Sequence, residues 1–385
     1  MTKGRGVVVL FLILVITGCG HGGNSGARNV LTVSVPASSS CNILNAPCVS
    51  VTICSPINGS CRTIPDILVD TGSSGLRVFS SLLNLNLLPA SDGSGLPIGE
   101  CVVYVDGSAE WGPVRIANVI LGNEPSVTVP IQAIESSFAG GPSPSCGTVR
   151  LLNAPGNGVT NGVLGIGIFQ YDQSLYFSCT SSACVAINPN PLLSLPASSF
   201  VQNPVFLLPT DNNGVILSFP SIPDTGARSV SGTLTLGIGT SSNNQPGNGV
   251  LLYAATPVGA LTTVYGGTTY SSSVIDSGTN VFGIPSDIPI NICTGVNAGF
   301  LCPAVTMVLT VANQASNGSE PSVAINIANM DNVYNSNFGV YNDIAIDSPA
   351  GWGFFFGFPF FLGRTIYFGY DQQPTPLGTG PFYAY

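Results

Sequence analysis

Short apolar runs, and not long helical periodicities, dominate the pattern of hydrophobic and polar positions along this chain. Runs rich in Val, Ile and Thr, such as 31–35, 48–54 and 114–121, are separated by clusters of Gly, Pro, Asn and Ser. Such runs predict β-strands bounded by turns. Because apolar residues at helical spacing are scarce, we expect an all-β protein with few and short helices.

Two of the apolar runs end in the same way. The sequence Asp-Thr-Gly-Ser begins at Asp70, and Asp-Ser-Gly-Thr begins at Asp276, each directly after a β-branched run. This pattern predicts a strand that ends in a tight turn presenting a carboxylate. Two such carboxylates brought together can share one proton and activate a water molecule without metal, histidine or cysteine.

Each acid turn is followed, later in its half of the chain, by an apolar-apolar-glycine segment. The first runs over 163–165 and the second over 355–357, and such a segment is expected to pass close beside another backbone. The repeated order indicates an internal duplication. A length of 385 residues suits two cores, so we predict an N-terminal β-lobe over 31–204 and a C-terminal β-lobe over 205–385, with a cleft between them.

The second half carries its own series of predicted strands before and after its acid turn. A run of phenylalanines towards the C-terminus is interpreted as a buried strand at the interface between the lobes. The runs are 206–208, 215–219, 232–236, 250–254 and, for the phenylalanines, 354–361.

The N-terminus has the features of an export signal. Lys3 and Arg5 precede an apolar run over 7–16, which is too short for a membrane-spanning helix. Residues 16–19 resemble the bacterial lipobox, so we predict a signal peptide over 1–18, a lipid anchor to the membrane at Cys19 and a flexible tether over 19–30. The absence of aspartate after Cys19 favours the outer membrane over the inner membrane. The alternative is an ordinary signal peptide that leaves Cys19 as a spare thiol.

Ten cysteines remain besides Cys19, an even number that indicates disulfides in an exported protein. Local spacing favours three pairs, and elimination leaves two more. The three are Cys54–Cys61, Cys179–Cys184 and Cys293–Cys302, and the remaining two are Cys41–Cys48 and Cys101–Cys146. Because no Cys-x-x-Cys spacing is present, we predict no metal site.

The residue inventory excludes several classes of function. The single histidine, His21, lies in the predicted tether, which excludes Ser-His-Asp and Cys-His catalysis. After removal of the signal the chain has no lysine and only seven arginines against 18 acidic residues, so it offers no footprint for nucleic acid. No dinucleotide or phosphate motif is found, and no cofactor is predicted. Carboxylates must therefore carry any catalysis.

Taken together, the two acid turns and their two partner segments resemble the pepsin-like aspartic peptidases. The resemblance implies a two-lobed, pepsin-like fold, a catalytic pair formed by Asp70 and Asp276, and a polypeptide substrate. Four hydroxyl residues are implied as supports: Ser73 and Thr279 to the outer carboxylate oxygens, Thr71 and Ser277 between the turns. The flap over the substrate is implied to contain Tyr104, Asp106 and Gly107. Because one chain supplies both turns, we expect a monomer.

The sequence also departs from the family pattern. Arg77 stands where the family usually has the tryptophan that supports the flap tyrosine, and we interpret it as a surface or cleft-rim residue. Val105 replaces a flap glycine, and Trp111 is considered as a possible substitute for the missing tryptophan. Two functions are therefore weighed: an envelope-anchored aspartic endopeptidase, and an inactive pepsin-like scaffold that serves as a binding or structural module. The complete set of hydroxyls favours the enzyme.

Overall fold

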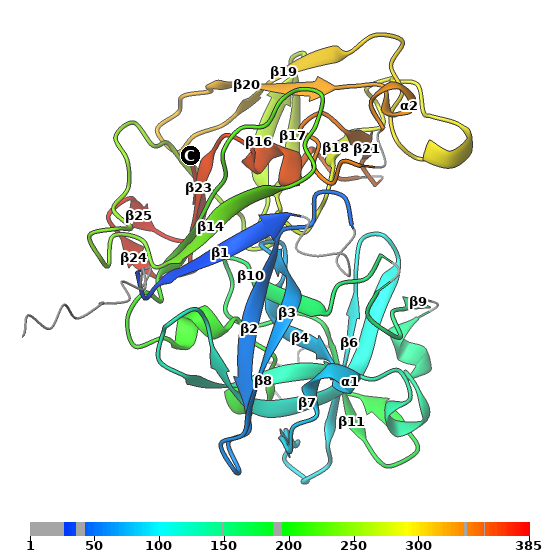
Figure 1. The fold of residues 1–385 in the computed structure, drawn as a ribbon, viewed down its shortest axis with the longest axis vertical. Coiled ribbons are helices and arrows are strands. Elements are labelled where there is room, and N and C mark those ends of the chain that lie inside the picture. Colours follow the sequence, from blue (N-terminus) through cyan, green and yellow to red (C-terminus); the bar gives the residue numbers. More distant parts are fainter. Residues whose placement is uncertain are drawn as a thin grey trace, which may run out of the picture.

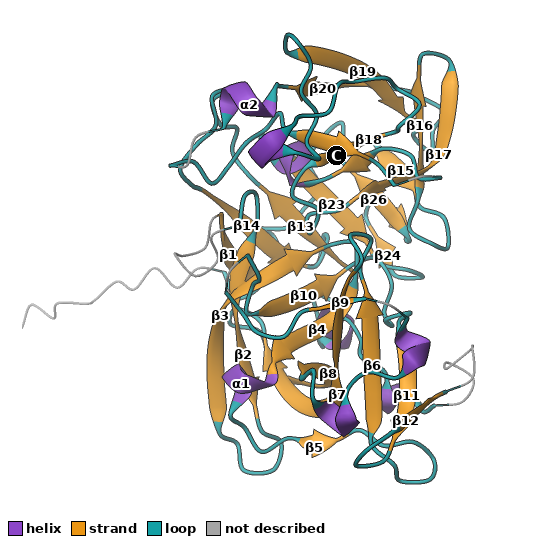
Figure 2. Ribbon diagram, turned by 90° about the vertical axis from the view of Figure 1, so that its right-hand side faces the viewer, coloured by secondary structure: helices purple, strands orange, loops and turns teal. Residues whose placement is uncertain are grey.

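Strands form nearly all the regular structure of the protein (Figure 2). The computed structural model describes residues 27–385 except 36–42, 148, 157, 188–194, 335–336 and 350. Within this part of the chain the α-helices α1 (Ser80–Leu83) and α2 (Met330–Val333) have four residues each. The predicted all-β class is confirmed.

Within the described residues, seventeen strands join into one sheet, seven into a second and two into a third. The first sheet contains β1 (Val30–Val35), β2 (Cys48–Cys54), β3 (Cys61–Asp70), β4 (Ser74–Phe79), β5 (Leu88–Pro89), β6 (Ile98–Val103), β7 (Ser108–Ile120), β8 (Val127–Ile134), β9 (Arg150–Leu151), β10 (Gly162–Ile166), β11 (Leu175–Cys179), β12 (Cys184–Ala186), β13 (Gly214–Ser218), β14 (Val230–Leu236), β15 (Leu252–Ala254), β23 (Thr365–Gly369) and β26 (Phe382–Ala384). The second contains β16 (Leu261–Tyr265), β17 (Thr268–Ile275), β18 (Phe282–Ile284), β19 (Met307–Asn313), β20 (Ser322–Ile327), β21 (Ala345–Asp347) and β22 (Phe355–Phe356). The third pairs β24 (Pro374–Thr375) with β25 (Gly378–Thr379).

One pattern of strand pairing occurs twice. In the first half, β10 runs parallel to β3 and antiparallel to β4, and β4 also pairs with β8 in parallel. In the second half, β22 runs parallel to β17 and antiparallel to β18, and β18 pairs with β21 in parallel. Each apolar-apolar-glycine segment therefore lies between the two strands that flank its acid turn, which supports the predicted duplication.

Glycine allows these segments to pass so close to the turns. A methyl group added to Gly165 would lie 2.8 Å from Ser73 Oγ, and one added to Gly357 would lie 2.0 Å from the carbonyl oxygen of Val281. Real side chains do not approach so closely, so only glycine fits at the two positions.

Strands from the two halves of the chain occupy opposite ends of the molecule, with β1 and β14 between them (Figure 1). The strand β1 pairs with β14 over six residues, from Val30 opposite Thr235 to Val35 opposite Val230. The first sheet thus crosses the predicted boundary at residue 204, and β1 belongs as much to the second half as to the first.

Apolar side chains from both halves form one large buried cluster. In β20, Val323, Ile325 and Ile327 are buried while Ser322 and Ala324 are exposed, as expected for a half-buried strand. The phenylalanine run 354–361 is buried throughout, as predicted, but only β22 within it is a strand. Residues Phe358–Phe361 form a 3₁₀ turn, because Pro359 cannot donate to a sheet ladder.

The predicted strand over 206–208 is wrong. Residues Pro204–Leu207 form a 3₁₀ turn, in which Pro204 stands at the start and the Asn203 side chain accepts a hydrogen bond from Val205 N–H (3.0 Å). Proline fixes the backbone for such a turn and lacks the N–H that a strand needs. The local turn chemistry therefore overrides the apolar run.

Four predicted disulfides are confirmed: Cys54–Cys61, Cys101–Cys146, Cys179–Cys184 and Cys293–Cys302. Four disulfides indicate an exported protein. Cys41 lies outside the described residues, so its pairing with the buried Cys48 stays a prediction. Within the described part of the chain, no helix is long and apolar enough to cross a bilayer.

The signal peptide and Cys19 lie outside the described residues, but the end of the predicted tether 19–30 does not. Asn29 is buried and donates to the carbonyl oxygen of Leu236 (2.9 Å), and Arg28 pairs with Glu124 (3.2 Å). These contacts hold residues 28–30 on the folded body. The predicted tether is therefore too long at its C-terminal end and stops before Arg28.

Candidate active site

Two acid turns meet between the halves of the chain. Asp70 ends β3, and Asp276 directly follows β17. In each turn the carboxylate folds back on its own backbone: Gly72 N–H donates to Asp70 Oδ1 (2.8 Å), and Gly278 N–H donates to Asp276 Oδ1 (2.7 Å). These Asx turns hold both carboxyl groups at fixed angles.

The hydroxyls at the fourth position of each turn hold the other carboxyl oxygen. Ser73 Oγ donates to Asp70 Oδ2, and Thr279 Oγ1 donates to Asp276 Oδ2 (2.7 Å). With both oxygens engaged in this way, neither carboxyl group can rotate freely.

The hydroxyls at the second position join the two turns. Thr71 N–H donates to Ser277 Oγ (3.2 Å), and Ser277 N–H donates to Thr71 Oγ1 (2.9 Å). In addition, Ser277 Oγ donates to the carbonyl oxygen of Val69 (2.7 Å). Segments more than 200 residues apart in the sequence are thus held together by buried hydrogen bonds.

Each carboxylate lies against the backbone of the opposite turn. A methyl group added to Gly72 would lie 2.7 Å from Asp276 Cγ, and one added to Gly278 would lie 2.6 Å from Asp70 Oδ1. Glycine is therefore required at both positions for the two carboxyl groups to face each other across this short gap.

The pair retains a proton above the usual range for carboxylic acids. Burial, the negative charge of Asp70 and a hydrogen bond with Asp70 together raise the pKa of Asp276 well above its ordinary value. Two carboxylates in contact cannot both ionise readily. At mildly acidic to neutral pH the pair therefore holds one proton, so it offers both an acid and a base.

A cleft of about 730 Å³ opens over the carboxyl pair. Both acid turns line it, and so do Tyr104 and Asp106 at the connection between β6 and β7. These strands form a hairpin in which Val103 lies opposite Ala109, and Gly107 takes the positive φ of 76° that the turn needs. The predicted flap residues therefore form a β-hairpin tip beside the carboxyl pair.

A neighbouring strand and a disulfide brace the flap hairpin. The short strand β9 runs parallel to β7, with Ser108 opposite Arg150, and Arg150 pairs with Asp106 (3.0 Å). The disulfide Cys101–Cys146 joins β6 to the segment that leads into β9. The flap is thus part of a small layered assembly and not a free hairpin.

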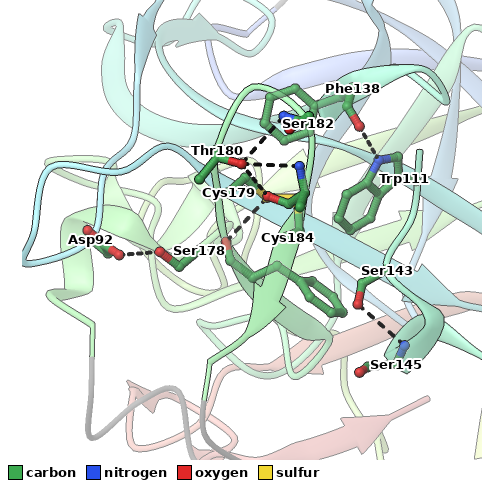
Figure 3. Close-up of a disulfide and its surroundings, with 12 residues drawn as sticks. Asp92, Trp111, Phe138, Ser143, Ser145, Ser178, Cys179, Thr180, Ser182 and Cys184 are labelled. Carbon is green, nitrogen blue, oxygen red and sulfur yellow. Dashed lines mark hydrogen bonds between the residues drawn. A yellow bond between two sulfur atoms is a disulfide. The ribbon is translucent and has the colours of Figure 1, made fainter. Parts of the chain in front are cut away.

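Trp111 does not support the flap tyrosine. Its ring packs against Phe138 and Phe177, and its Nε1 donates to the carbonyl oxygen of Phe138 (3.1 Å), beside the disulfide Cys179–Cys184 (Figure 3). The adjacent Glu110 lines the cleft instead, because successive residues of β7 point to opposite sides. The Tyr104 hydroxyl donates to Glu110 Oε2 (2.9 Å).

The interpretation of Arg77 as a surface or rim residue is wrong. Its side chain is fully buried and pairs with Asp172 (2.8 Å) and Glu100 (3.4 Å). Strand β4 is buried on both faces, so each of its side chains must point into the interior, and the buried carboxylates provide the partners that a buried cation requires.

Sequence reasoning missed Glu100, Glu110 and Asp172. The available signal was that Glu100 and Glu110 stand directly beside the apolar residues Cys101 and Trp111, since a charged residue among core positions demands a partner. Burial raises the pKa of Glu100 well above its usual value despite Arg77, and burial raises the pKa of Glu110 to about 7. Glu110 therefore holds a proton at acidic pH.

One cluster of potential metal ligands occurs among the described residues, but it cannot bind a metal through its sulfurs. Cys293, Cys302 and Asp331 lie together, but both sulfurs are engaged in a disulfide and cannot serve as thiolate ligands.

No curated protein matches the sequence. The model of one protein family, described as "Protein of unknown function (DUF3443)", matches residues 25–385 and so covers the whole candidate site. The chain therefore belongs to the DUF3443 family.

Proposed function

We propose that this protein is an aspartic endopeptidase with a pepsin-like fold of two related β-lobes and a cleft between them. The observation that carries the proposal is the meeting of two Asp turns from different halves of the chain, in which each carboxylate lies against the glycine of the opposite turn. The repeated strand pairing around these turns supports the two-lobed, pepsin-like fold.

In the proposed reaction the ionised member of the pair takes a proton from a water molecule held between the carboxyl groups. The oxygen of that water attacks a peptide carbonyl, while the protonated member donates a hydrogen bond to the developing oxyanion. Because the pKa of Asp276 is raised, we assign the retained proton to Asp276 and the base to Asp70. Asp70 then gives the proton that it took from water to the leaving amine as the C–N bond breaks, and the former carbonyl carbon becomes a carboxylic acid.

The substrate in this proposal is an extended polypeptide that lies in the cleft beneath the flap. We further propose that the enzyme acts as a monomer at the bacterial cell envelope, attached to the outer membrane through a lipid at Cys19. The seven arginines and absence of lysine after the signal give it no basic surface with which to bind nucleic acid.

The test is cleavage of an unfolded, reduced and carboxymethylated protein between pH 3 and 7 by a chain that starts at residue 27. Asp70→Asn and Asp276→Asn keep the shape of the site but remove a charge, and Asp287→Asn, an exposed residue outside the cleft, serves as the control. We expect acid-favoured cleavage that both site variants lose and the control retains.

If folded wild-type protein cleaves nothing at any pH, the endopeptidase proposal is wrong. The inactive scaffold, serving as an envelope binding or structural module, then becomes the better explanation of the cleft.

A further inference from the structure

The flap tyrosine is held by a buried acid in place of a tryptophan. Glu110 is 2% exposed and lies in β7, opposite Val102 of β6. From there its Oε2 accepts the hydrogen bond of the Tyr104 hydroxyl (2.9 Å). The side chain also lines the cleft that contains the carboxyl pair. One residue thus touches both the flap and the space above the proposed catalytic centre.

The wall from which Glu110 projects is fixed by Arg77. This guanidinium donates to the carbonyl oxygen of Ser74 (3.0 Å), four residues after Asp70. It also pairs with Glu100 of β6 and with Asp172, which lies between β10 and β11. Gln132 Nε2 donates to the carbonyl oxygen of Glu100 (2.9 Å) and to that of Glu110 (3.5 Å). The network therefore connects the acid turn of β3 to the flap through buried polar contacts.

We propose that Glu110 is the positioning residue that holds Tyr104 over the carboxyl pair, and that the buried Arg77 network fixes Glu110 for this task. The inference rests on the proposed endopeptidase function and deepens it. It assigns a role to four charged residues that the peptide-bond chemistry itself does not use. Glu110 acts through Tyr104 and need not touch the scissile bond.

The charged and titratable groups that face Glu110 come from four segments: Tyr104, Arg77, Asp70 and Asp172. Since burial raises its pKa to about 7, Glu110 is neutral at acidic pH and accepts the Tyr104 hydrogen bond through a carboxyl oxygen. A glutamine at position 110 would offer a similar neutral oxygen to accept the hydrogen bond of the Tyr104 hydroxyl. Above that pKa the carboxylate adds a negative charge near Asp70, which favours retention of the proton by the catalytic pair.

The test compares Glu110→Ala, Glu110→Gln and Tyr104→Phe by kcat, KM and pH profile on the unfolded protein substrate. We expect Glu110→Ala and Tyr104→Phe each to lower kcat/KM roughly tenfold, with no further loss in the double variant, because both remove the same hydrogen bond. Glu110→Gln should keep near-normal activity at acidic pH, while the upper limb of its profile moves to lower pH. The control, Glu124→Gln, removes a buried carboxyl group that pairs with Arg28 outside the cleft. It should change neither kcat/KM nor the pH profile.

A second measurement does not depend on cleavage. Urea unfolding of Tyr104→Phe, Glu110→Ala and the double variant at pH 8 should show non-additive shifts of the midpoint, since each single variant removes the same hydrogen bond. Additive shifts, or a Glu110→Ala enzyme with wild-type kcat and KM, would overturn the inference. Non-additive shifts in a protein that cleaves nothing would overturn the proposed function and leave Glu110 as the residue that positions the flap.

Discussion

At the scale of single residues, the two glycines of the acid turns control how close the carboxyl groups come. Gly72 and Gly278 each have space for a hydrogen atom and none for a methyl group, which would lie under 3 Å from the opposite carboxyl group. A substitution there must push the turns apart. Gly247 offers a matched control, because a methyl group added there would lie no nearer than 3.9 Å to another atom.

We therefore expect Gly72→Ala to lower the free energy of unfolding by about 1–3 kcal/mol through overpacking. A displacement of the carboxyl pair by about 1 Å should lower kcat/KM on the order of one hundredfold. Urea unfolding and the cleavage assay measure the two effects. Gly247→Ala should change neither, and a fully active Gly72→Ala enzyme would show that the turns tolerate separation.

The chemistry of the two turns could be predicted from sequence because it depends on adjacent residues. An Asx turn and the hydroxyl that follows it lie within four consecutive positions, so the hydrogen bond between Ser73 and Asp70 can be predicted from the local sequence. Arg77 could not be placed in the same way. Its partners Glu100 and Asp172 lie 23 and 95 residues further along the chain, and no local spacing links them.

At the scale of elements, the flap owes its position to its neighbours as much as to its own hairpin. The disulfide Cys101–Cys146 and the short strand β9 are attached to β6 and β7, respectively. On the cleft side, Glu110 holds the flap through its hydrogen bond with Tyr104, and the network around the buried Arg77 fixes the strand that carries Glu110. A hairpin held on both sides moves less than one that is free at its tip.

Removing the flap disulfide should affect substrate binding. We expect Cys101→Ser/Cys146→Ser to raise KM with a smaller change in kcat, and to lower the free energy of unfolding by about 4 kcal/mol, given the sequence separation of 45 between the cysteines. Cys54→Ser/Cys61→Ser, which opens a seven-residue loop in the β2–β3 hairpin, should cost about 2 kcal/mol and leave KM unchanged. An equal rise of KM in both double variants would contradict this role of the flap disulfide.

Element prediction succeeded where apolar alternation decides the structure and failed where turn chemistry or distant pairing decides it. The apolar-apolar-glycine segments indicated a close backbone approach, and β10 and β22 make one. The sequence did not predict that β8 pairs with β4 or that β21 pairs with β18. The hydrophobic pattern of a strand does not specify which distant strand lies beside it. The turn at Pro204 could have been found from its proline.

At the scale of the whole molecule, several buried acids bind protons more tightly in the folded state than in the unfolded state. Burial raises the pKa of Glu110 to about 7 and that of Asp343 to about 6, and the pKa values of Asp276 and Glu100 are also raised. Their usual values are 3.8 for Asp and 4.5 for Glu. Between those values and the raised ones, the folded state holds more protons.

The free energy of unfolding should therefore fall as pH rises through about pH 4 to 8, since stability declines with pH wherever the folded state binds the excess protons. We expect Tm to be several degrees higher near pH 4.5 than near pH 8. Scanning calorimetry across this range measures the slope, which Glu110→Gln should reduce. A Tm that rises steadily from pH 4.5 to 8 would contradict the assignment.

Attachment to the membrane is the second prediction at this scale. When the full chain is expressed in a bacterial host, we expect a radiolabelled fatty acid to be incorporated into the protein and the protein to sediment with membranes. Cys19→Ser should abolish labelling, because a lipid anchor at this position is attached through the thiol. Labelling that persists in Cys19→Ser would show that the anchor is elsewhere, and no labelling of the wild-type chain would show that there is none.

The twofold pattern of strand pairing does not extend to the walls of the cleft. Tyr104, Glu110 and Asp172 line it on the side of the first half, whereas the described lining from the second half contains no tyrosine and, beyond Asp276, one acid, Asp347. A peptide threaded through the cleft and the same peptide threaded backwards therefore meet different surroundings. The proposed endopeptidase should accordingly discriminate between a peptide sequence and its reverse, and so distinguish the two directions of its substrate chain.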